Sequence, residues 1–420
     1  MVTKLITLGV IVLGVIALAQ LMRIYELTSK LRKTGEHEIS NRDNKINAKL
    51  WVAFMVFLYA GFFWLMLEYG WTGRGDAASV HGANLDWLLN LNFVIIIAVF
   101  FLTNTLLFMF SYKYVKEPGV KAFYYPHNNK LEMLWTVVPA CVLAVIIILG
   151  LQSWTDATGK SKPEAIRVEL FSKQFDWTAR YSGEDNTLGR HDYKLTNDDN
   201  NPLGLLTAET IKSAIENMEA SMDAIESELN NDSIMMVPKD RASKETDLSR
   251  KSRLIRLLHQ MEGRHDAKND DQVYDDVIQT DTLYLCKGKE YEFNFRSKDV
   301  IHSAYFPHFR AQMNTVPGMV TRFKFIPSKT TAEMRVERMQ EDFNFILMCN
   351  KICGGAHYKM KMMVVVMEEE DYNNWWDAKK KMTFRSTFFA SDDSETASSE
   401  ESMTSTDSNA LVDSSATAMN

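Results

Sequence analysis

Four long stretches without a charged residue constrain this chain more than any other feature. They are Leu5–Met22, Trp51–Leu67, Trp87–Tyr112 and Met133–Thr155. An α-helix of about 20 apolar residues spans a bilayer, so each stretch is a transmembrane candidate. The mean hydropathy of −0.20 stays near zero because very polar segments balance these spans. We therefore expect a multi-pass protein of the lipid bilayer and exclude a purely soluble one.

Charge and cysteine content exclude two further classes. The net charge is −7 and no basic block is concentrated, so we expect no nucleic-acid partner. Four cysteines in 420 residues do not make a disulfide scaffold.

Basic residues in the loops predict the orientation of the spans. They crowd the first and third loops: Arg23, Lys30, Arg32, Lys33, Arg42, Lys45, Lys49, and then Lys113, Lys116, Lys121, Lys130. Arg74 is the one basic residue in the second loop. Loops rich in lysine and arginine stay cytoplasmic, which predicts an outside N-terminus and an outside C-terminal half after Thr155. Cleavage after Ala17-Leu18-Ala19, as in a signal peptide, is the alternative, but it would reverse this charge pattern.

The C-terminal half has the pattern of an all-β domain with a helical insertion. Alternating or continuous apolar residues predict strands at 167–171, 283–285, 291–295, 320–325, 333–337 and 361–367. An apolar stripe in 206–262 predicts two helices separated by Pro238: Ile211, Ile215, Met218, Met222, Ile225, Leu229, then Leu254, Ile255, Leu258, Met261. We interpret this segment as a helical hairpin inserted in a β-domain loop, with a separate functional module as the alternative.

The expected organisation has four parts. These are two N-terminal transmembrane helices in 1–72, a transmembrane helical hairpin in 85–157, an all-β domain in 163–380 with its insertion at 206–265, and a tail at 386–420. The tail contains Ser, Thr, Asp and Glu without lysine or arginine and should be disordered.

The segment from Cys349 to Met360 carries the chemistry. Cys349, Cys353, His357 and Met360 supply two thiols, an imidazole and a thioether within twelve residues. Thiolate and thioether are soft ligands, and the thioether favours copper over zinc. Gly354-Gly355 makes a tight ligand loop more plausible than a helix. His302 is a further candidate ligand.

Other interpretations of these residues stay open. Cys349 and Cys353 could form a disulfide, or bind structural zinc with His357 and His302. Cys141 lies within the last span and is expected to pack there, and Cys286 in a strand is expected to be buried and inert. No Cys-x-x-Cys-His motif for haem attachment occurs.

Several motifs together resemble subunit II of haem–copper cytochrome c oxidases. The resemblance covers 87–181 and 280–380, and includes the membrane hairpin with Leu131–Pro139, the Gln174–Trp177 segment and Asp299–Ser303. Val316–Met319 and the Cys349–Met360 loop complete it. It implies a cupredoxin-like domain that holds a dinuclear copper centre, CuA. Cys349 and Cys353 would bridge the coppers, with His302, His357, Met360 and the Lys351 carbonyl as further ligands.

The resemblance also implies residues for electron entry and proton uptake. Phe175 stands where the family usually has its entry tryptophan, Trp177 is retained, and Asp299 is expected to help dock a basic donor. Lys351 replaces the family's usual glutamate, which puts the magnesium site next to subunit I in doubt. Glu132 is expected near the entrance of a proton pathway, although a helix N-terminal glutamate favoured by the macrodipole explains it equally well.

The function implied is that of an enzyme subunit. The chain would accept electrons from cytochrome c, or from a haem domain of a partner respiratory complex. It would pass them to haem a of subunit I, where oxygen is reduced to water with proton pumping, so no catalytic residue lies in this chain. Subunits I and III are the expected partners, in a bacterial inner membrane with the copper domain periplasmic. A membrane-anchored copper-delivery module and a quinol oxidase subunit II without CuA are the alternatives.

Overall fold

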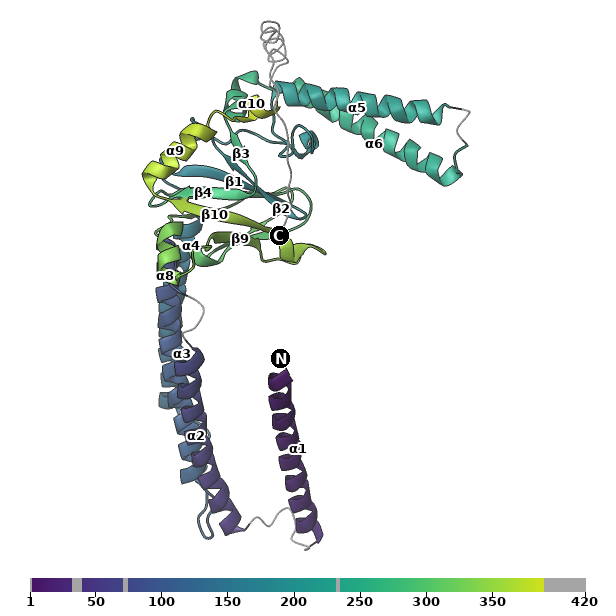
Figure 1. Ribbon diagram of the computed structural model, residues 1–420. Coiled ribbons are helices and arrows are strands. Elements are labelled where there is room, and N and C mark those ends of the chain that lie inside the picture. Colours follow the sequence, from purple (N-terminus) through teal and green to yellow (C-terminus); the bar gives the residue numbers. More distant parts are fainter. Residues whose placement is uncertain (1, 32–39, 71–74, 232–234, 389–420) are drawn as a thin grey trace, which may run out of the picture. The chain divides into compact units, whose positions relative to one another are not determined.

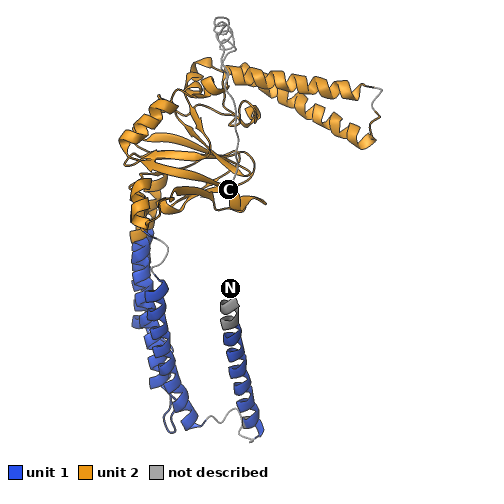
Figure 2. Cartoon of the chain, in the orientation of Figure 1, with its two compact units in different colours: residues 1–75, 88–147 blue, residues 76–87, 148–420 orange. Residues whose placement is uncertain are grey.

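The computed structural model describes residues 2–31, 40–70, 75–231 and 235–388, which divide into two compact units. Unit 1 comprises residues 1–75 and 88–147, and unit 2 comprises 76–87 and 148–420 (Figure 2).

Four helices account for the predicted membrane spans. They are α1 (Val2–Leu31), α2 (Asn41–Tyr69), α3 (Val80–Lys113) and α4 (Asn129–Thr158), and all four are long and apolar enough to cross a membrane (Figure 1). Helix α2 packs against α3 through aromatic rings. Trp51 stacks on Phe108 with centroids 5.8 Å apart, and the Tyr59 hydroxyl lies 2.9 Å from that of Thr105.

Two five-stranded sheets form the core of unit 2. One has the order β3-β2-β1-β5-β8 and the other β4-β10-β9-β6-β7. The strands are β1 (Ile166–Lys173), β2 (Asp176–Tyr181), β3 (Val277–Gln279), β4 (Thr282–Cys286), β5 (Tyr291–Ser297), β6 (His302–Phe306), β7 (Ala311–Thr315), β8 (Thr321–Phe325), β9 (Phe345–Cys349) and β10 (Lys361–Met367). The pairs β1–β5 and β4–β10 are parallel, and the others are antiparallel. The predicted fold class, four apolar helices followed by a cupredoxin-like β-domain, is confirmed.

An aromatic core supports the two sheets. Phe293 and Phe325 stack with centroids 4.9 Å apart, and Phe309 stacks on Phe325 at 5.0 Å. Alternate residues of β5 are aromatic, so a single face of the strand buries Tyr291, Phe293 and Phe295. This packing fixes β5 and the residues that follow it.

One predicted strand is wrong. Residues 333–337 lie in the helix α8 (Thr331–Arg338), which begins at a capping box between Thr330 and Glu333. The apparent alternation came from Met334 and Val336, but Met334 is buried while Val336 is 80% exposed. The capping residues decide the structure here, because a capping box satisfies two free backbone donors of the first turn.

The insertion is the predicted helical hairpin, with α5 (Ala208–Leu229) followed by α6 (Pro238–Glu262) (Figure 1). Ile211, Ile215 and Leu258 are buried between the helices and the loop residue Leu195. Lys244 forms an ion pair with Glu228, and the Lys251 ammonium donates to the Ser221 hydroxyl.

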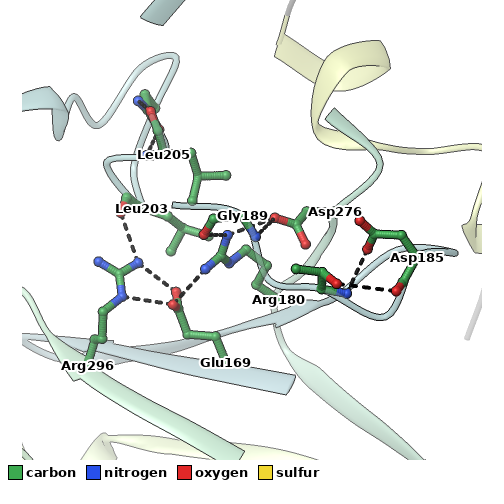
Figure 3. A network of polar contacts seen from close by, with 10 residues as sticks. Glu169, Arg180, Asp185, Gly189, Leu203, Leu205, Asp276 and Arg296 are labelled. Carbon is green, nitrogen blue, oxygen red and sulfur yellow. Dashed lines mark hydrogen bonds and ion pairs between the residues drawn. The ribbon is translucent and has the colours of Figure 1, made fainter. Parts of the chain in front are cut away.

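A buried ionic network lies beneath the segment that leads into the hairpin (Figure 3). Glu169 accepts hydrogen bonds from Arg180 at 2.8 Å and from Arg296 at 2.6 Å, and Arg180 also pairs with Asp276 at 2.7 Å. The Arg180 guanidinium donates to the Gly189 carbonyl and that of Arg296 to the Leu203 carbonyl. Burial works to raise the pKa of Glu169, but the two guanidinium groups lower it well below its ordinary value. The network therefore holds residues 189–203 on strands β1, β2 and β5.

Short helices complete unit 2. They are α7 (Asp271–Tyr274), α9 (Glu369–Lys379) and α10 (Phe384–Phe388), with 3-10 turns at Tyr193–Leu195, Ala267–Asn269, Pro307–Phe309 and His357–Lys359. Residues 386–388 of the expected disordered tail belong to α10. The rest of that tail, 389–420, lies outside the described residues.

Candidate metal centre

Two neighbouring strands and one loop bring the candidate ligands together. His302 is the first residue of β6, Cys349 is the last residue of β9, and these strands pair with Ala304 opposite Cys349. The loop after Cys349 returns through the 3-10 turn at His357–Lys359 to Met360, whose carbonyl accepts a hydrogen bond from the Cys349 amide at 3.0 Å. As the sequence predicts, the ligand segment around Gly354-Gly355 is a loop and no α-helix.

The donor atoms converge on one buried point. The thiol sulfurs of Cys349 and Cys353 lie 3.9 Å apart. His302 Nδ1 lies 4.0 Å from Cys349 Sγ, and His357 Nδ1 lies 3.5 Å from Cys353 Sγ. His302, Cys349 and Cys353 are all buried, and one ligand atom from each lies within 4.8 Å of the others.

Two further predicted ligands lie next to the thiols. Met360 Sδ is 3.9 Å from Cys353 Sγ, and the main-chain carbonyl oxygen of Lys351 is 3.2 Å from Cys349 Sγ. The structure thus brings together all six ligand positions that the resemblance implies.

The chemistry of this donor set fits copper. The cysteines are free, and their sulfurs lie far beyond the bonding distance of about 2.05 Å, so the structure holds no disulfide here. Burial and the Cys349 thiol raise the pKa of Cys353 to about 11, so a cation must displace a proton to bind this sulfur. Two thiols, two imidazoles and a thioether favour a soft metal over magnesium or calcium.

Asp299 orients one imidazole of the site. Its carboxylate lies 2.8 Å from His302 Nε2 and accepts hydrogen bonds from the backbone amides of Gln174 and Val300. Burial works to raise the pKa of Asp299, but the bonds from His302 and these amides lower it. A proton held on Nε2 leaves Nδ1 free for a metal. In the structure Asp299 supports a candidate ligand, and its expected role in docking a donor stays a prediction.

Gln174 supports the ligand loop from the other side and was not singled out from the sequence. Its side-chain amide donates to the Cys353 carbonyl. Gly354 sits against it with a φ of +141°, and a Cβ at this position would lie 2.8 Å from Phe175 Cζ. The sequence signal was present in the Gln174–Trp177 segment, but it was interpreted for its aromatic residues alone.

The two aromatic residues predicted for electron entry differ in their burial. Phe175 is half-buried next to the ligand loop. Trp177 is fully buried, and its ring lies edge-on to His302 with centroids 6.3 Å apart. Trp177 therefore packs behind a candidate ligand. The electron-entry roles of Phe175 and Trp177 stay predictions.

Glu132 belongs to the N-terminal end of α4 in unit 1. Its carboxylate accepts a hydrogen bond from the Asn128 amide at 3.1 Å, and Asn128 in turn accepts from the Leu131 amide. These contacts are those of a helix cap, which supports the structural alternative. The proton-pathway role stays a prediction.

The remaining cysteines lie elsewhere. Cys286 is buried at the end of β4, as expected. Cys141 of α4 is exposed on this chain, so the packing expected for it does not occur within the chain.

Fold and site together define a membrane-anchored β-domain with a buried cluster of soft metal ligands. Residues 70–153 match the model of the cytochrome C oxidase subunit II transmembrane domain. The chain is 27% identical over 279 residues to an alternative cytochrome c oxidase subunit 2 of Bradyrhizobium diazoefficiens, a match covering 66% of this chain and 73% of the relative. It is 21% identical over 299 residues to a cytochrome c oxidase subunit 2 of Corynebacterium glutamicum, covering 70% and 71%.

One solved structure is also among the matches. It is the periplasmic domain of subunit II of cytochrome oxidase from Bradyrhizobium japonicum, at 15% identity, covering 53% of this chain and 99% of that one, with a TM-score of 0.26. The assignment rests on the sequence relatives and the transmembrane domain. They confirm the resemblance of this chain to subunit II of cytochrome c oxidases.

Proposed function

We propose that this chain is the electron-entry subunit of a respiratory cytochrome c oxidase and that its β-domain holds a dinuclear copper centre, CuA. The observation that carries the proposal is the pair of buried thiols 3.9 Å apart, with one imidazole nitrogen next to each sulfur. Such a pair can be shared by two metal ions, and the imidazole beside each sulfur then provides one nitrogen ligand for each ion.

Each residue has a role in this site. Cys349 and Cys353 would hold the copper ions through their thiolate sulfurs, and His302 and His357 would supply one imidazole each. Met360 and the Lys351 carbonyl complete the ligand set. Copper, when bound, supplies a one-electron redox couple shared over both ions. The strands β6 and β9 and the bonds from Asp299 and Gln174 keep the ligands fixed, which limits the rearrangement that accompanies electron transfer.

The proposal also includes the electron donor, the partner subunits and the membrane. The domain accepts electrons from a cytochrome c, or from a haem domain of a partner complex, at the surface around Phe175. It delivers them to haem a of subunit I, which reduces oxygen to water and pumps protons. Subunits I and III are the proposed partners in a bacterial cell membrane, with the β-domain and the N-terminus periplasmic. Lys351 has no carboxylate for a magnesium ion at the subunit I boundary.

The two alternatives make different predictions. A quinol oxidase subunit II without CuA would lack the ligand set, whereas all six positions converge here. A copper-delivery module would bind copper and release it to an acceptor, with no need for the oxidase transmembrane domain that residues 70–153 match.

Copper loading of the purified full-length chain tests the proposal. We expect two coppers per chain, a purple colour and a multi-line EPR signal from an unpaired electron shared between two copper nuclei. Cys353→Ser should abolish this signal, while Cys286→Ser, which changes a buried cysteine outside the site, should leave it intact. One copper per chain, or a colourless and EPR-silent loaded protein, would contradict CuA.

A further inference from the structure

A lysine-lined cavity lies in unit 1, apart from the copper ligands. It has a volume of about 1160 Å³ and is formed by the first turns of α2, the last residues of α3 and the loop that follows. Its lining includes five lysines, Lys45, Lys49, Lys113, Lys116 and Lys121, and one acidic residue, Glu117. The cavity is therefore strongly cationic and large enough for a small-molecule headgroup.

The lysines are only partly neutralised by the chain. Lys45 pairs with Glu117 at 3.4 Å, which ties α2 to the loop after α3. The Lys113 ammonium lies 5.4 Å from the centre of the Tyr114 ring. Over the ranges 2–31, 40–70, 75–231 and 235–388, no ion pair is recorded for Lys49, Lys116 or Lys121. Three cations thus face the cavity without a carboxylate partner in the described chain.

The position of the cavity along the helices corresponds to the depth of lipid headgroups. The apolar part of α2 begins at Trp51, so Lys49 lies about 3 Å and Lys45 about 9 Å beyond it at 1.5 Å per residue. Lys113 follows the last apolar residue of the α3 stretch, Tyr112. Headgroup layers occupy roughly the first 5–8 Å outside the hydrocarbon core. Headgroups lie at this depth in either leaflet.

Exposed aromatic residues next to the lysines point to lipid. Phe123 lines the cavity and is 87% exposed, and Tyr124 and Tyr125 beside it are also exposed. Large rings exposed beside lysines are unfavourable in water but typical of the membrane interface, where the ring contacts acyl carbons and the ammonium contacts phosphate.

We propose that this cavity binds the phosphate headgroup of an anionic phospholipid. Lys49, Lys116 and Lys121 bind the phosphate, and Phe123 packs against the upper acyl chains. A zwitterionic lipid carries its own ammonium group, which five lysines repel, so the cavity selects anionic over zwitterionic headgroups. The bound lipid joins α2 to the α3–α4 loop, where Lys45 and Glu117 already form a contact. Lipid binding at this cavity does not require the copper centre.

Native mass spectrometry of the full-length chain in neutral detergent tests the site. Titration with dioleoylphosphatidylglycerol should give saturable binding, and dioleoylphosphatidylcholine should bind at least about tenfold more weakly, since each basic residue contributes about 1 kcal/mol. Equal binding of the two lipids would overturn the proposal. So would displacement of the lipid by millimolar inorganic phosphate, because the cavity would then be a site for free phosphate. These wild-type measurements do not depend on any variant.

Variants then locate the binding. The triple variant Lys49→Gln, Lys116→Gln, Lys121→Gln should weaken phosphatidylglycerol binding by about tenfold or more. The control Arg23→Gln, Arg42→Gln, Lys130→Gln removes the same charge from residues that do not line the cavity, and it should bind normally. Replacing the three lysines with arginine should preserve binding. Equal weakening in the glutamine variant and the control would show unspecific surface attraction and overturn the site.

Discussion

The Asp299 carboxylate lies 2.8 Å from Nε2 of His302, while Nδ1 of the same ring faces the Cys349 thiol at 4.0 Å. One carboxylate thus fixes which nitrogen carries the proton and which is available to a metal. Asp299 is itself fixed by the backbone amides of Gln174 and Val300, so the orientation of the imidazole depends on two separate segments of the chain.

Removing this carboxylate should weaken copper binding. We expect Asp299→Ala to lower copper affinity about 10- to 100-fold, because the ring loses the partner that orients it. Competition between the copper-loaded chain and a chelator measures the change. Asp377→Ala is the matched control, since Asp377 is an exposed residue of α9 that pairs with Lys380. Unchanged copper retention in Asp299→Ala would show that the loop alone orients His302.

Glu169→Gln should destabilise the β-domain strongly. The change leaves Arg296 buried without its carboxylate partner and Arg180 with Asp276 alone, and breaking a buried ion pair costs about 3–5 kcal/mol. Denaturation of the full-length chain, followed by tryptophan fluorescence, measures the free energy of unfolding. Glu184→Gln removes an exposed partner of Lys380 and should cost less than about 1 kcal/mol. Similar effects of the two variants would refute a stabilising role for the buried network.

The candidate metal ligands could be predicted because most of them are close in sequence. Cys349, Cys353, His357 and Met360 lie within one loop, so their residue types and the two glycines were informative without a fold. His302 is 47 residues away from Cys349, and its place in the site depended on the family resemblance. The role of Gln174 could not be predicted, because it depends on a contact with Cys353, which is 179 residues away. Asp299 is three residues from His302, but its contact with the imidazole depends on how the chain turns before β6.

The burial of Glu169 in the ionic network, by contrast, could not be predicted from the sequence. Glu169 alternates with Val168 and Leu170 in β1, and alternation predicts that such a charged residue faces solvent. In the structure it is buried, because the segment 189–203 covers that face of the sheet and brings carbonyl groups to the guanidinium groups. The alternation of residues within one β-strand carries no information about another segment of the chain that covers the polar face of the sheet.

His308 should make the β-domain less stable in acid. Burial, with Arg338 and Arg310 nearby, lowers the pKa of His308 from an ordinary 6.5 to about 4. Between about pH 6.5 and pH 4, His308 therefore binds a proton in the unfolded chain but not in the folded chain. Stability is lost as the pH falls through this range. His308→Phe keeps a ring beside Phe343 and Phe345 but removes this titration. As the pH falls, the apparent Tm of the wild type should decrease more than that of His308→Phe. A difference in Tm that does not change with pH would contradict the prediction.

The adjacent glycines of the ligand loop should respond very differently to alanine. At Gly354 a Cβ would lie 2.8 Å from Phe175 Cζ and 2.9 Å from Gln174 Nε2. The backbone φ of Gly354 is +141°, a value that residues with a side chain rarely adopt. At Gly355 a Cβ would meet nothing within 4 Å. Because backbone strain of this kind costs about 1–3 kcal/mol, Gly354→Ala should displace the loop and lower copper affinity by roughly 5- to 100-fold. Gly355→Ala should retain copper as the wild type does. Chelator competition on the two full-length variants makes the comparison, and equal retention would mean that the Gln174–Phe175 contact does not set the position of Cys353.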